Sequence, residues 1–425
     1  MNDDDRFESG GVADLIESMV GDALTVRIEA YDGTEAGPAE ATTTIVITSP
    51  DALVRILHSP NELGVARAYA AGDIDVLGDI RGLFELRHVI DNLDIRPQQL
   101  RVAARLVGRR ALRPLPLPPE EARPHGRLHS LRRDRKVISH HYDLSNRFYS
   151  LFLDESMTYS CAVFEQAGWT LEQAQRAKHE LALRKLALEP GMRILDIGCG
   201  WGAHALHAAR NFGVDVVGVT LAVEQIELGR KRVAEMGLSS QIELRLQDYR
   251  RIDDGPFDAI TSIGMFEHVG WARTAEFFGQ VRHLVRPGGR VLLHSITKPD
   301  ARKPRGRRAQ FIYRYIFPDG ELQPVGRIVD QMQLADLDVI DVDALNQHYA
   351  TTLDHWLKRL EQRWDEAVDE VGLNRARIWK LYLAGCGFAF QSRQVQVHQI
   401  AAAAPHVDGR TAAPRRPDWD PAHLG

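Results

Sequence analysis

The chain has 425 residues, a length that predicts two or three domains. Its composition, 44% hydrophobic and 26% charged, is that of a globular protein and excludes a fibrous or wholly disordered chain. The net charge of −5 argues against general nucleic-acid binding, and three scattered cysteines exclude a disulfide framework.

Residues 1–20 are expected to be disordered. They start MNDDDRFESG, which is acidic and unlike a secretory signal. Residues 21–95 are expected to form a small α+β domain, in which LTVRIEAY and ATTTIVITS are predicted strands and SPDALVRILHSP a predicted helix. This domain contains no concentrated catalytic groups, so we expect a packing or docking module.

Residues 96–136 are expected to be a basic, proline-rich helix and linker. Between Arg96 and Lys136 there are twelve basic residues and three acidic ones, a net charge of +9. Arg101, Arg105 and Arg109 recur every four residues and therefore share one helix face. A solvated linker and a contact with anionic lipid headgroups are both compatible with this run, and a second basic cluster, RKPRGRR (302–308), favours the lipid surface. No aromatic residues alternate with these arginines, so nucleic acid is a weaker third possibility.

Residues 137–402 alternate between strand and helix patterns. The predicted strands are RILDIG, VDVVGVT, IELRLQD, FDAITSIG and GRVLLHSIT. In LAVEQIELGRKRVAEM, the residues Ile226, Gly229, Val233 and Met236 share one helix face. This alternation predicts an α/β fold with a mostly parallel, doubly wound sheet. Residues 403–425, rich in Ala, Pro and Arg, are expected to be a flexible tail.

A glycine-rich segment, LDIGCGWGAHAL, follows the first predicted strand of this region. Glycines at such a turn let a ligand approach the backbone at a helix N-terminus. A dinucleotide site would need an acidic residue at the end of the next strand, and that strand ends at Thr220. DxGxGxG, here from Asp196 to Gly202, is instead typical of class I AdoMet-dependent methyltransferases, and a turn without a ligand is the alternative.

The motifs of the whole region resemble one family. HHYDLSNRFYSLFLDESMTYSCAVF, LDIGCGWG, QDYR, GMFEHVG, LLHSIT, YIFPDGELQP, HYATTLDHW and YLAGCGFAFQSR are similar to those of the cyclopropane-fatty-acyl-phospholipid and mycolic acid cyclopropane synthases. The resemblance covers about residues 137–402. It implies a Rossmann-like methyltransferase domain, and ELGVARAYAAGDIDV implies an N-terminal domain like that of the phospholipid synthases.

The resemblance implies S-adenosyl-L-methionine (AdoMet) as methyl donor. The implied cofactor-binding residues are Tyr159, Ser160, Asp196, Gly198, Gly200, Gly202, Thr220, Leu221, Gln225, Gln247, Asp248 and Tyr249. One departure from the family pattern is Ala222, which stands where the family has a serine hydroxyl, so one hydrogen bond to the cofactor is expected to be missing.

The family also implies a bound bicarbonate ion as base. The residues that match its site are Cys161, Glu267, His294, Ile296 and Tyr349. A carboxylate repels bicarbonate unless one of the two carries a proton, so Glu267 is the unusual member. Cys386 is expected to be structural and close to the site. A carbocation is stabilised by aromatic faces, and the aromatic candidates are Tyr142, Phe148, Tyr159, Phe266, Tyr313 and Tyr349.

We therefore expect a cytoplasmic enzyme, peripheral on the inner face of the membrane, that converts a cis double bond of a phospholipid acyl chain into a cyclopropane. The alternative product of the same methyl transfer is a 10-methylene chain, the precursor of 10-methyl branched fatty acids. A small-molecule methyltransferase and a non-catalytic lipid-binding protein are less compatible with these motifs. We expect a homo-oligomer such as a dimer, no nucleic-acid partner and no metal site.

Overall fold

The computed structural model describes residues 10–85, 97–122, 126, 128–130, 133–134, 144–300, 310–411, 413–414 and 419. The chain forms two compact units. Unit 1 comprises Met1–Arg123, Arg305–Pro318 and Ala367–Phe388, and unit 2 comprises Pro124–Pro304, Asp319–Glu366 and Ala389–Gly425. Within the described ranges, every helix is too short or too polar to span a bilayer.

Unit 1 has the expected α+β character and is built on a four-stranded sheet in the order β2-β1-β3-β4. β1 and β3 are parallel, and the other neighbouring pairs are antiparallel. Its elements are α2 (Val12–Val20), η1 (Gly21–Ala23), β1 (Arg27–Ala30), β2 (Glu35–Ala36), β3 (Thr43–Ile47), α3 (Asp51–His58), α4 (Glu62–Ala71), β4 (Ile74–Gly78), α5 (Gly82–Glu85), α7 (Pro97–Val107), η2 (Gly108–Leu112), α14 (Phe311–Tyr315) and most of α18 (Leu373–Gln391). Apolar side chains from both strands and helices pack together in a hydrophobic core of this unit.

The expectation that residues 1–20 are disordered is wrong for residues 12–20, which form α2. Val12, Ala13 and Leu15 are buried in the core of unit 1, so burial of these apolar side chains favours the helix. The backbone N–H of Val12 donates to Asp32 at 2.8 Å and so satisfies one of the free donors of the helix start.

The helix predicted in the basic segment is present as α7, and it packs against α2 and α3. Gln99, Ala103 and Val107 recur every four residues and form its buried face. The expected linker is still packed on unit 1 at Glu121, which is buried and forms an ion pair with Arg67 at 2.7 Å. Arg96, Arg123, Arg127, Arg132, Arg135, Lys136 and residues 302–308 lie outside the described residues.

The five strands predicted for the catalytic region are present and run parallel to one another. They are β5 (Arg193–Ile197), β6 (Asp215–Thr220), β7 (Ile242–Leu246), β8 (Phe257–Ile263) and β9 (Val285–Thr297). Two further strands, β10 (Asp338–Ala344) and β11 (Gln396–Ala403), were not predicted. The complete order is β10-β11-β9-β8-β5-β6-β7, with β11 antiparallel to both of its neighbours. The predicted α/β fold with a mostly parallel sheet is confirmed.

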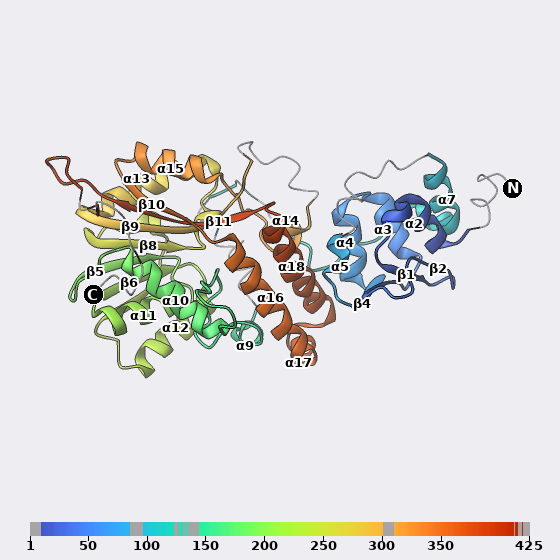
Figure 1. Cartoon of the computed structure of the whole chain (residues 1–425), viewed down its shortest axis with the longest axis horizontal. Helices are drawn as coiled ribbons and strands as arrows, with labels where there is room; N and C mark the ends of the chain where they lie inside the picture. The colour runs from blue at the N-terminus through green and yellow to red at the C-terminus, as the bar shows by residue number, and fades with distance from the viewer. Residues whose placement is uncertain are drawn as a thin grey trace. The chain divides into compact units, whose positions relative to one another are not determined.

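Helices cover both faces of this sheet (Figure 1). One core contains side chains of α10 (Leu171–Arg184), α11 (Ala203–Phe212) and α12 (Val223–Glu235), and the other contains side chains of α13 (Thr274–Leu284) and α15 (Val325–Leu334). The predicted buried face of α12 holds for Ile226, Gly229 and Val233. It fails at Met236, which is 44% exposed because the helix ends one residue earlier.

The remaining elements are α9 (Asn146–Ser150), η3 (Tyr249–Arg251), η4 (Phe266–His268), η5 (Trp271–Arg273), α16 (Asn346–Gln362) and α17 (Trp364–Val371). The expected start of the flexible tail at residue 403 is wrong, because Ala403 is the last residue of β11 and Ala404 is fully buried. Thr411 also donates to Asp338 at 2.8 Å. Residues 305–318 and 367–388, which fall within the expected catalytic domain 137–402, belong to unit 1.

Candidate active site

The glycine-rich loop connects β5 to α11 at the carboxyl edge of the parallel strands. Gly198 and Gly200 have φ angles of +90° and +54°, in the left-handed region where only glycine is free of strain. A Cβ atom on Gly198 would lie 2.6 Å from the Cβ of Met265, whereas one on Gly200 would meet no atom within 4 Å. Gly198 is therefore required by packing, and Gly200 leaves open space beside the loop.

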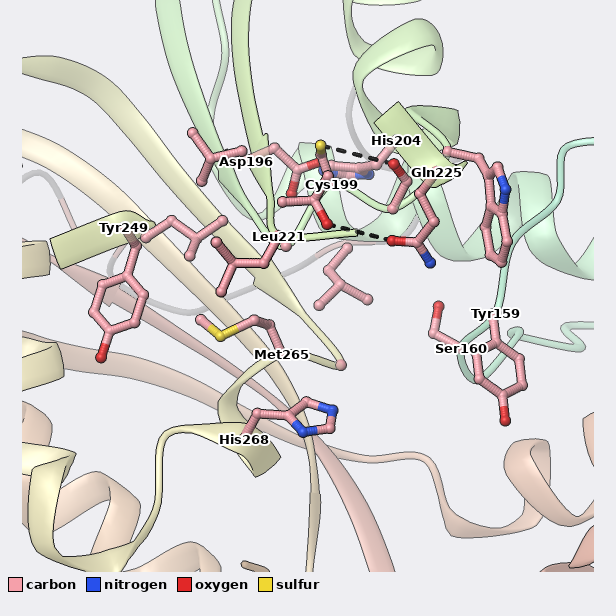
Figure 2. A pocket seen from close by; sticks show the side chains of 18 of the residues that line it. Tyr159, Ser160, Asp196, Cys199, His204, Leu221, Gln225, Tyr249, Met265 and His268 are labelled. Carbon is pink, nitrogen blue, oxygen red and sulfur yellow. Dashed lines mark hydrogen bonds between the residues drawn. The ribbon is translucent and has the colours of Figure 1, made fainter. Parts of the chain in front are cut away.

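A cavity of about 150 Å³ lies against this loop. It is lined by eleven of the twelve residues predicted to bind the cofactor; the exception is Gly202, which is the N-cap of α11. Figure 2 shows Asp196, Cys199 and His204 grouped on one wall, with Tyr159 and Ser160 on another part of the cavity. The sequence motifs therefore lie together around one small-molecule pocket.

The carboxyl ends of β6 and β7 form one end of the pocket. Thr220 donates to Gln225 at 3.3 Å, and the backbone N–H of Ala222 donates to Thr220 at 3.3 Å. Asp248 accepts from Arg250 at 2.6 Å, which fixes its carboxylate at the pocket edge. Ala222, where the family pattern has serine, is the N-cap of α12 and supplies no side-chain cap.

A buried chain of hydrogen bonds leads from Asp154 to the pocket wall. Ser156 donates its only hydroxyl hydrogen to Asp154, so Thr158, 2.6 Å away, must donate to Ser156. Thr158 then accepts from His179 Nε2 at 3.1 Å, which leaves His179 Nδ1 free to accept from His204 Nδ1 at 3.0 Å. Burial lowers the pKa of both imidazoles well below the usual range, so both are neutral. His204 Nε2 is consequently a bare acceptor, and it is buried without a hydrogen-bond partner.

Two further buried charges line the pocket, and sequence patterns did not indicate the first. Lys178 is 1% exposed, its Nζ lies 3.2 Å from Ser160 Oγ, and burial lowers its pKa to about 8. Among the described acidic residues, none lies within ion-pair distance of this ammonium group. Asp196 accepts from Thr261 at 3.0 Å through one oxygen, and its other oxygen is buried without a partner. Burial raises the pKa of Asp196 to about 6.

Glu267 and His294 lie next to this pocket, on η4 and β9, and were both predicted to hold an anion. The Glu267 carboxyl accepts from the backbone N–H of Ile296 at 2.6 Å, and its second oxygen is buried without a partner. Burial raises the pKa of Glu267 to about 7. The backbone N–H of Ile296, a residue expected at the bicarbonate site, is therefore occupied by Glu267.

The tautomer of His294 is set by strand β11. Gln399 faces His294 across the β9–β11 ladder, and its Nε2 lies 3.2 Å from His294 Nδ1. Burial lowers the pKa of His294 to about 3, so the ring is neutral. With Nδ1 accepting from Gln399, Nε2 carries the hydrogen, and this donor is buried without a partner.

Cys161 and Tyr349, the other two predicted anion ligands, both contact the backbone carbonyl of Leu345. The thiol of Cys161 lies 3.8 Å from the Leu345 carbonyl, which also accepts from the backbone N–H of Tyr349 at 3.2 Å. The backbone N–H of Leu345 donates to Val397, which pairs with Ile296 in the sheet. Burial raises the pKa of the Cys161 thiol, so it is a neutral donor.

An aromatic wall connects the pocket with Tyr349. The ring of Tyr159 lies 5.3 Å from Trp356, which lies 6.1 Å from Tyr349, and Tyr349 lies 4.5 Å from Phe390. Trp356 is fully buried and was missed from the sequence.

The other aromatic candidates lie elsewhere or are core residues. Phe266 is 1% exposed and packs on Phe277 and Phe278 in the core. Phe148 is also fully buried, Tyr313 belongs to unit 1, and Tyr142 lies outside the described residues.

Cys386, like Tyr313, belongs to unit 1. It lies on α18 and does not line the pocket. Removal from water raises the pKa of its thiol to about 12, which disfavours the thiolate form. A role as a nucleophile is therefore not supported, and the expected structural role remains a prediction.

Comparisons with known proteins agree with this geometry. The sequence profile of the family described as mycolic acid cyclopropane synthetase matches residues 129–400. A probable fatty acid methyltransferase of Mycobacterium tuberculosis is 42% identical over 407 residues, covering 93% of this chain and 95% of that protein. The tuberculostearic acid methyltransferase of the same organism is 36% identical over 403 residues, covering 92% and 90% of the two chains.

A solved structure is similar to the larger part of the chain. It is the mycolic acid cyclopropane synthase CmaA1 in complex with SAH and CTAB, which is 36% identical, with a TM-score of 0.60. The similarity covers 63% of this chain and 98% of that protein. It confirms the class I methyltransferase fold that the glycine loop predicted.

Proposed function

The chain belongs to the mycolic acid cyclopropane synthetase family and is an AdoMet-dependent methyltransferase, and from that premise we propose that it converts a cis double bond of an unsaturated phospholipid acyl chain into a cyclopropane ring. One arrangement carries the proposal: next to the cofactor pocket, one oxygen of the Glu267 carboxyl and Nε2 of His294 are buried without a partner, and an aromatic wall runs from the same pocket to Tyr349. Such a site suits a reaction that generates a cation and then removes a proton.

The pocket residues fit AdoMet. When bound, AdoMet supplies an electrophilic methyl group to the double bond. Gly200 leaves the space that a ligand needs beside the loop, and Thr220, Gln225 and Asp248 place polar atoms at one end of the cavity. Most residues that line the pocket are buried, which limits the contact of water with a reactive methyl group.

The buried charges of the pocket are complementary to the zwitterionic amino-acid part of AdoMet. The ammonium group of Lys178 would bind the methionine carboxylate beside Ser160. Asp196 and the bare Nε2 of His204 would accept from the methionine ammonium group. An unpaired buried charge is unfavourable in the empty pocket, so a ligand that pairs it gains affinity.

The aromatic wall would stabilise the positive charge that develops on the acyl chain. The faces of Tyr159 and Tyr349 attract a cation through their quadrupoles without forming a bond to it, and the fully buried Trp356 packs against both rings. A thiolate at this place would trap the cation. The raised pKa of the Cys161 thiol, which keeps it neutral, is consistent with this requirement.

The residues around Glu267 fit a bicarbonate ion, which would supply the base. His294 offers its Nε2–H as a donor, and Glu267, with a pKa raised to about 7, can be protonated and donate through its second oxygen. A protonated Glu267 removes the repulsion between two anions. Cys161 and the Tyr349 hydroxyl are the further donors proposed for this site.

A second product of the same methyl transfer is an exocyclic methylene. It requires the hydrogen on the methylated carbon to move to the neighbouring cationic carbon before the methyl group loses a proton. The similarity to a tuberculostearic acid methyltransferase, which covers about nine tenths of both chains, supports the exocyclic methylene as the alternative product.

Incubation with AdoMet and oleoyl phospholipid vesicles tests the proposal. Gas chromatography and proton NMR of the released fatty acids distinguish a ring methylene from an exocyclic methylene, which have the same mass. We expect the ring, and a loss of turnover in bicarbonate-depleted buffer that added bicarbonate restores. An unchanged oleoyl chain would contradict the methyl transfer, and full turnover without bicarbonate would contradict the base.

A further inference from the structure

One face of unit 1 combines exposed arginines with exposed apolar side chains. On α7, Arg101 and Arg105 point away from the buried row Gln99, Ala103 and Val107. Gln99 donates to the backbone carbonyl of Ser18 at 3.1 Å, which fixes the rotation of the helix on unit 1. The arginines are therefore held on the outer surface by the packing of the opposite face.

The charge of this face is largely unneutralised. Arg101, Arg105, Arg109 and Arg113 are exposed, and none of them forms an ion pair with a described acidic residue. Arg110 is the exception, at 3.5 Å from Asp51. Structural arginines elsewhere in this unit have partners at 2.7 Å, as Arg55 does with Asp73. Exposed cations without acidic neighbours favour binding to an external anion.

Apolar side chains on the same elements are exposed to water. Leu112, at the end of η2, is 78% exposed, and Leu100, on α7, is 44% exposed. Tyr31, 38% exposed, lies close enough to Arg110 for that guanidinium to lower the tyrosine pKa, although burial and Asp32 raise it overall. Leucine, tyrosine and arginine together are typical of surfaces that lie at the level of lipid headgroups.

We propose that this face, defined as Tyr31, Leu100, Arg101, Arg105, Arg109, Leu112 and Arg113, docks the protein on the anionic phospholipid surface of the inner leaflet. The arginines bind headgroup phosphates, and Leu112 and Leu100 enter the headgroup region beneath them. The inference rests on the proposed function, because an acyl-chain substrate is reached only from a bilayer. It assigns docking to unit 1, whereas the chemistry belongs to unit 2.

Co-sedimentation with vesicles tests the docking face without relying on turnover. The probe is phosphatidylcholine with about one third phosphatidylglycerol, compared with phosphatidylcholine alone, at low and high salt. The charge variant is R101Q/R105Q/R109Q, and its matched control is R176Q/R210Q/R375Q, which removes three exposed arginines elsewhere. The apolar variant is Leu112→Ser, and its control is Leu334→Ser, whose leucine is 74% exposed.

We expect the charge variant to lower the vesicle partition coefficient by roughly 100-fold, because each arginine near an anionic surface contributes about fivefold. Leu112→Ser should lower it by about tenfold, and both controls should bind like the wild type. Equal binding of the charge variant and its control, or salt-sensitive binding to DNA fragments without vesicle binding, would overturn the proposal. AdoMet binding and turnover on detergent-dispersed lipid should be unchanged in the charge variant, so a failure of docking is distinguishable from a failure of the proposed chemistry.

Discussion

Most residues of the cofactor pocket could be predicted from the sequence, because they lie in short segments at the ends of consecutive parallel strands. Asp196 lies near the end of β5, Gly198 and Gly200 follow this strand, and Gln247 follows β7, so strand order alone brings them together. Lys178 and His204 could not be predicted to act together. Their relation depends on two contacts that no local pattern encodes: the bond of Lys178 to Ser160, and the bond between His179 of α10 and His204 of α11.

Gly200 provides the most direct test of the pocket at the level of one residue. Gly200→Val would place a branched side chain in the left-handed region and in the space beside the loop. We expect AdoMet affinity to fall by at least 100-fold in a calorimetric titration, with the far-UV spectrum unchanged. Gly326→Ala, on α15 with open space around its Cα, is the control. Unchanged affinity in a folded Gly200→Val protein would exclude AdoMet from this cavity.

Lys178 gives AdoMet binding a defined pH dependence. Because burial lowers the pKa of Lys178 to about 8, the free pocket loses this cation as the pH rises above that value. We expect the affinity for AdoMet to decrease between pH 7 and pH 9 as the ammonium group that pairs with its carboxylate is lost.

Lys178→Met removes the charge and keeps the side-chain volume. A hydrogen bond to a charged group contributes about 1.5–3 kcal/mol, so the affinity at pH 7 should fall by roughly 10- to 100-fold. The remaining pH dependence should then be that of AdoMet itself. If wild type and Lys178→Met have parallel pH profiles, Lys178 does not bind the carboxylate.

At the level of elements, the parallel strands could be predicted and the two C-terminal strands could not. β5 and β6 are rich in Val, Ile and Leu, and most residues of β5, β6 and β8 are buried, as expected for strands covered on both faces. β11 contains three alanines in succession, which locally favour a helix, and it is a strand because β9 and β10 pair with it on both sides. α2 was missed because acidic residues precede it in the chain.

The unpredicted strand β11 carries Gln399, which we assign as a positioning residue for His294. Gln399→Leu should leave His294 Nδ1 without its donor, so that the Nε2–H tautomer is no longer enforced. We expect kcat to fall by about 10- to 100-fold, with the dissociation constant of AdoMet unchanged. Nitrogen NMR of the imidazole should show a mixture of tautomers.

Gln399→Glu provides the complementary variant. Its carboxylate would accept from Nδ1–H and so turn Nε2 from a donor into an acceptor. It should therefore be at least as inactive as Gln399→Leu. Wild-type turnover in either variant would show that the orientation of His294 does not depend on β11.

At the level of the whole molecule, the presence of two units could be predicted, but their boundaries could not. Residues 305–318 and 367–388 join unit 1 through contacts remote in sequence, such as the ion pair of Arg314 with Glu121 at 3.0 Å and that of Arg377 with Asp75 at 2.7 Å. Neither of these two ion pairs could be predicted from the length or the charge of the chain. The expected domain boundaries at residues 95 and 136 therefore differ from those of the fold, in which unit 1 also includes two later segments of the chain.

The central claim is that the methyl group of AdoMet becomes a carbon of the acyl chain after losing one hydrogen. AdoMet with a fully deuterated methyl group, incubated with the enzyme and oleoyl phospholipid, tests it most directly by mass spectrometry of the fatty acids. We expect one added carbon that keeps all but one of the methyl deuterium atoms, within a cyclopropane ring. A methyl group that keeps all its deuterium, label on the headgroup, or no label in the lipid would contradict it.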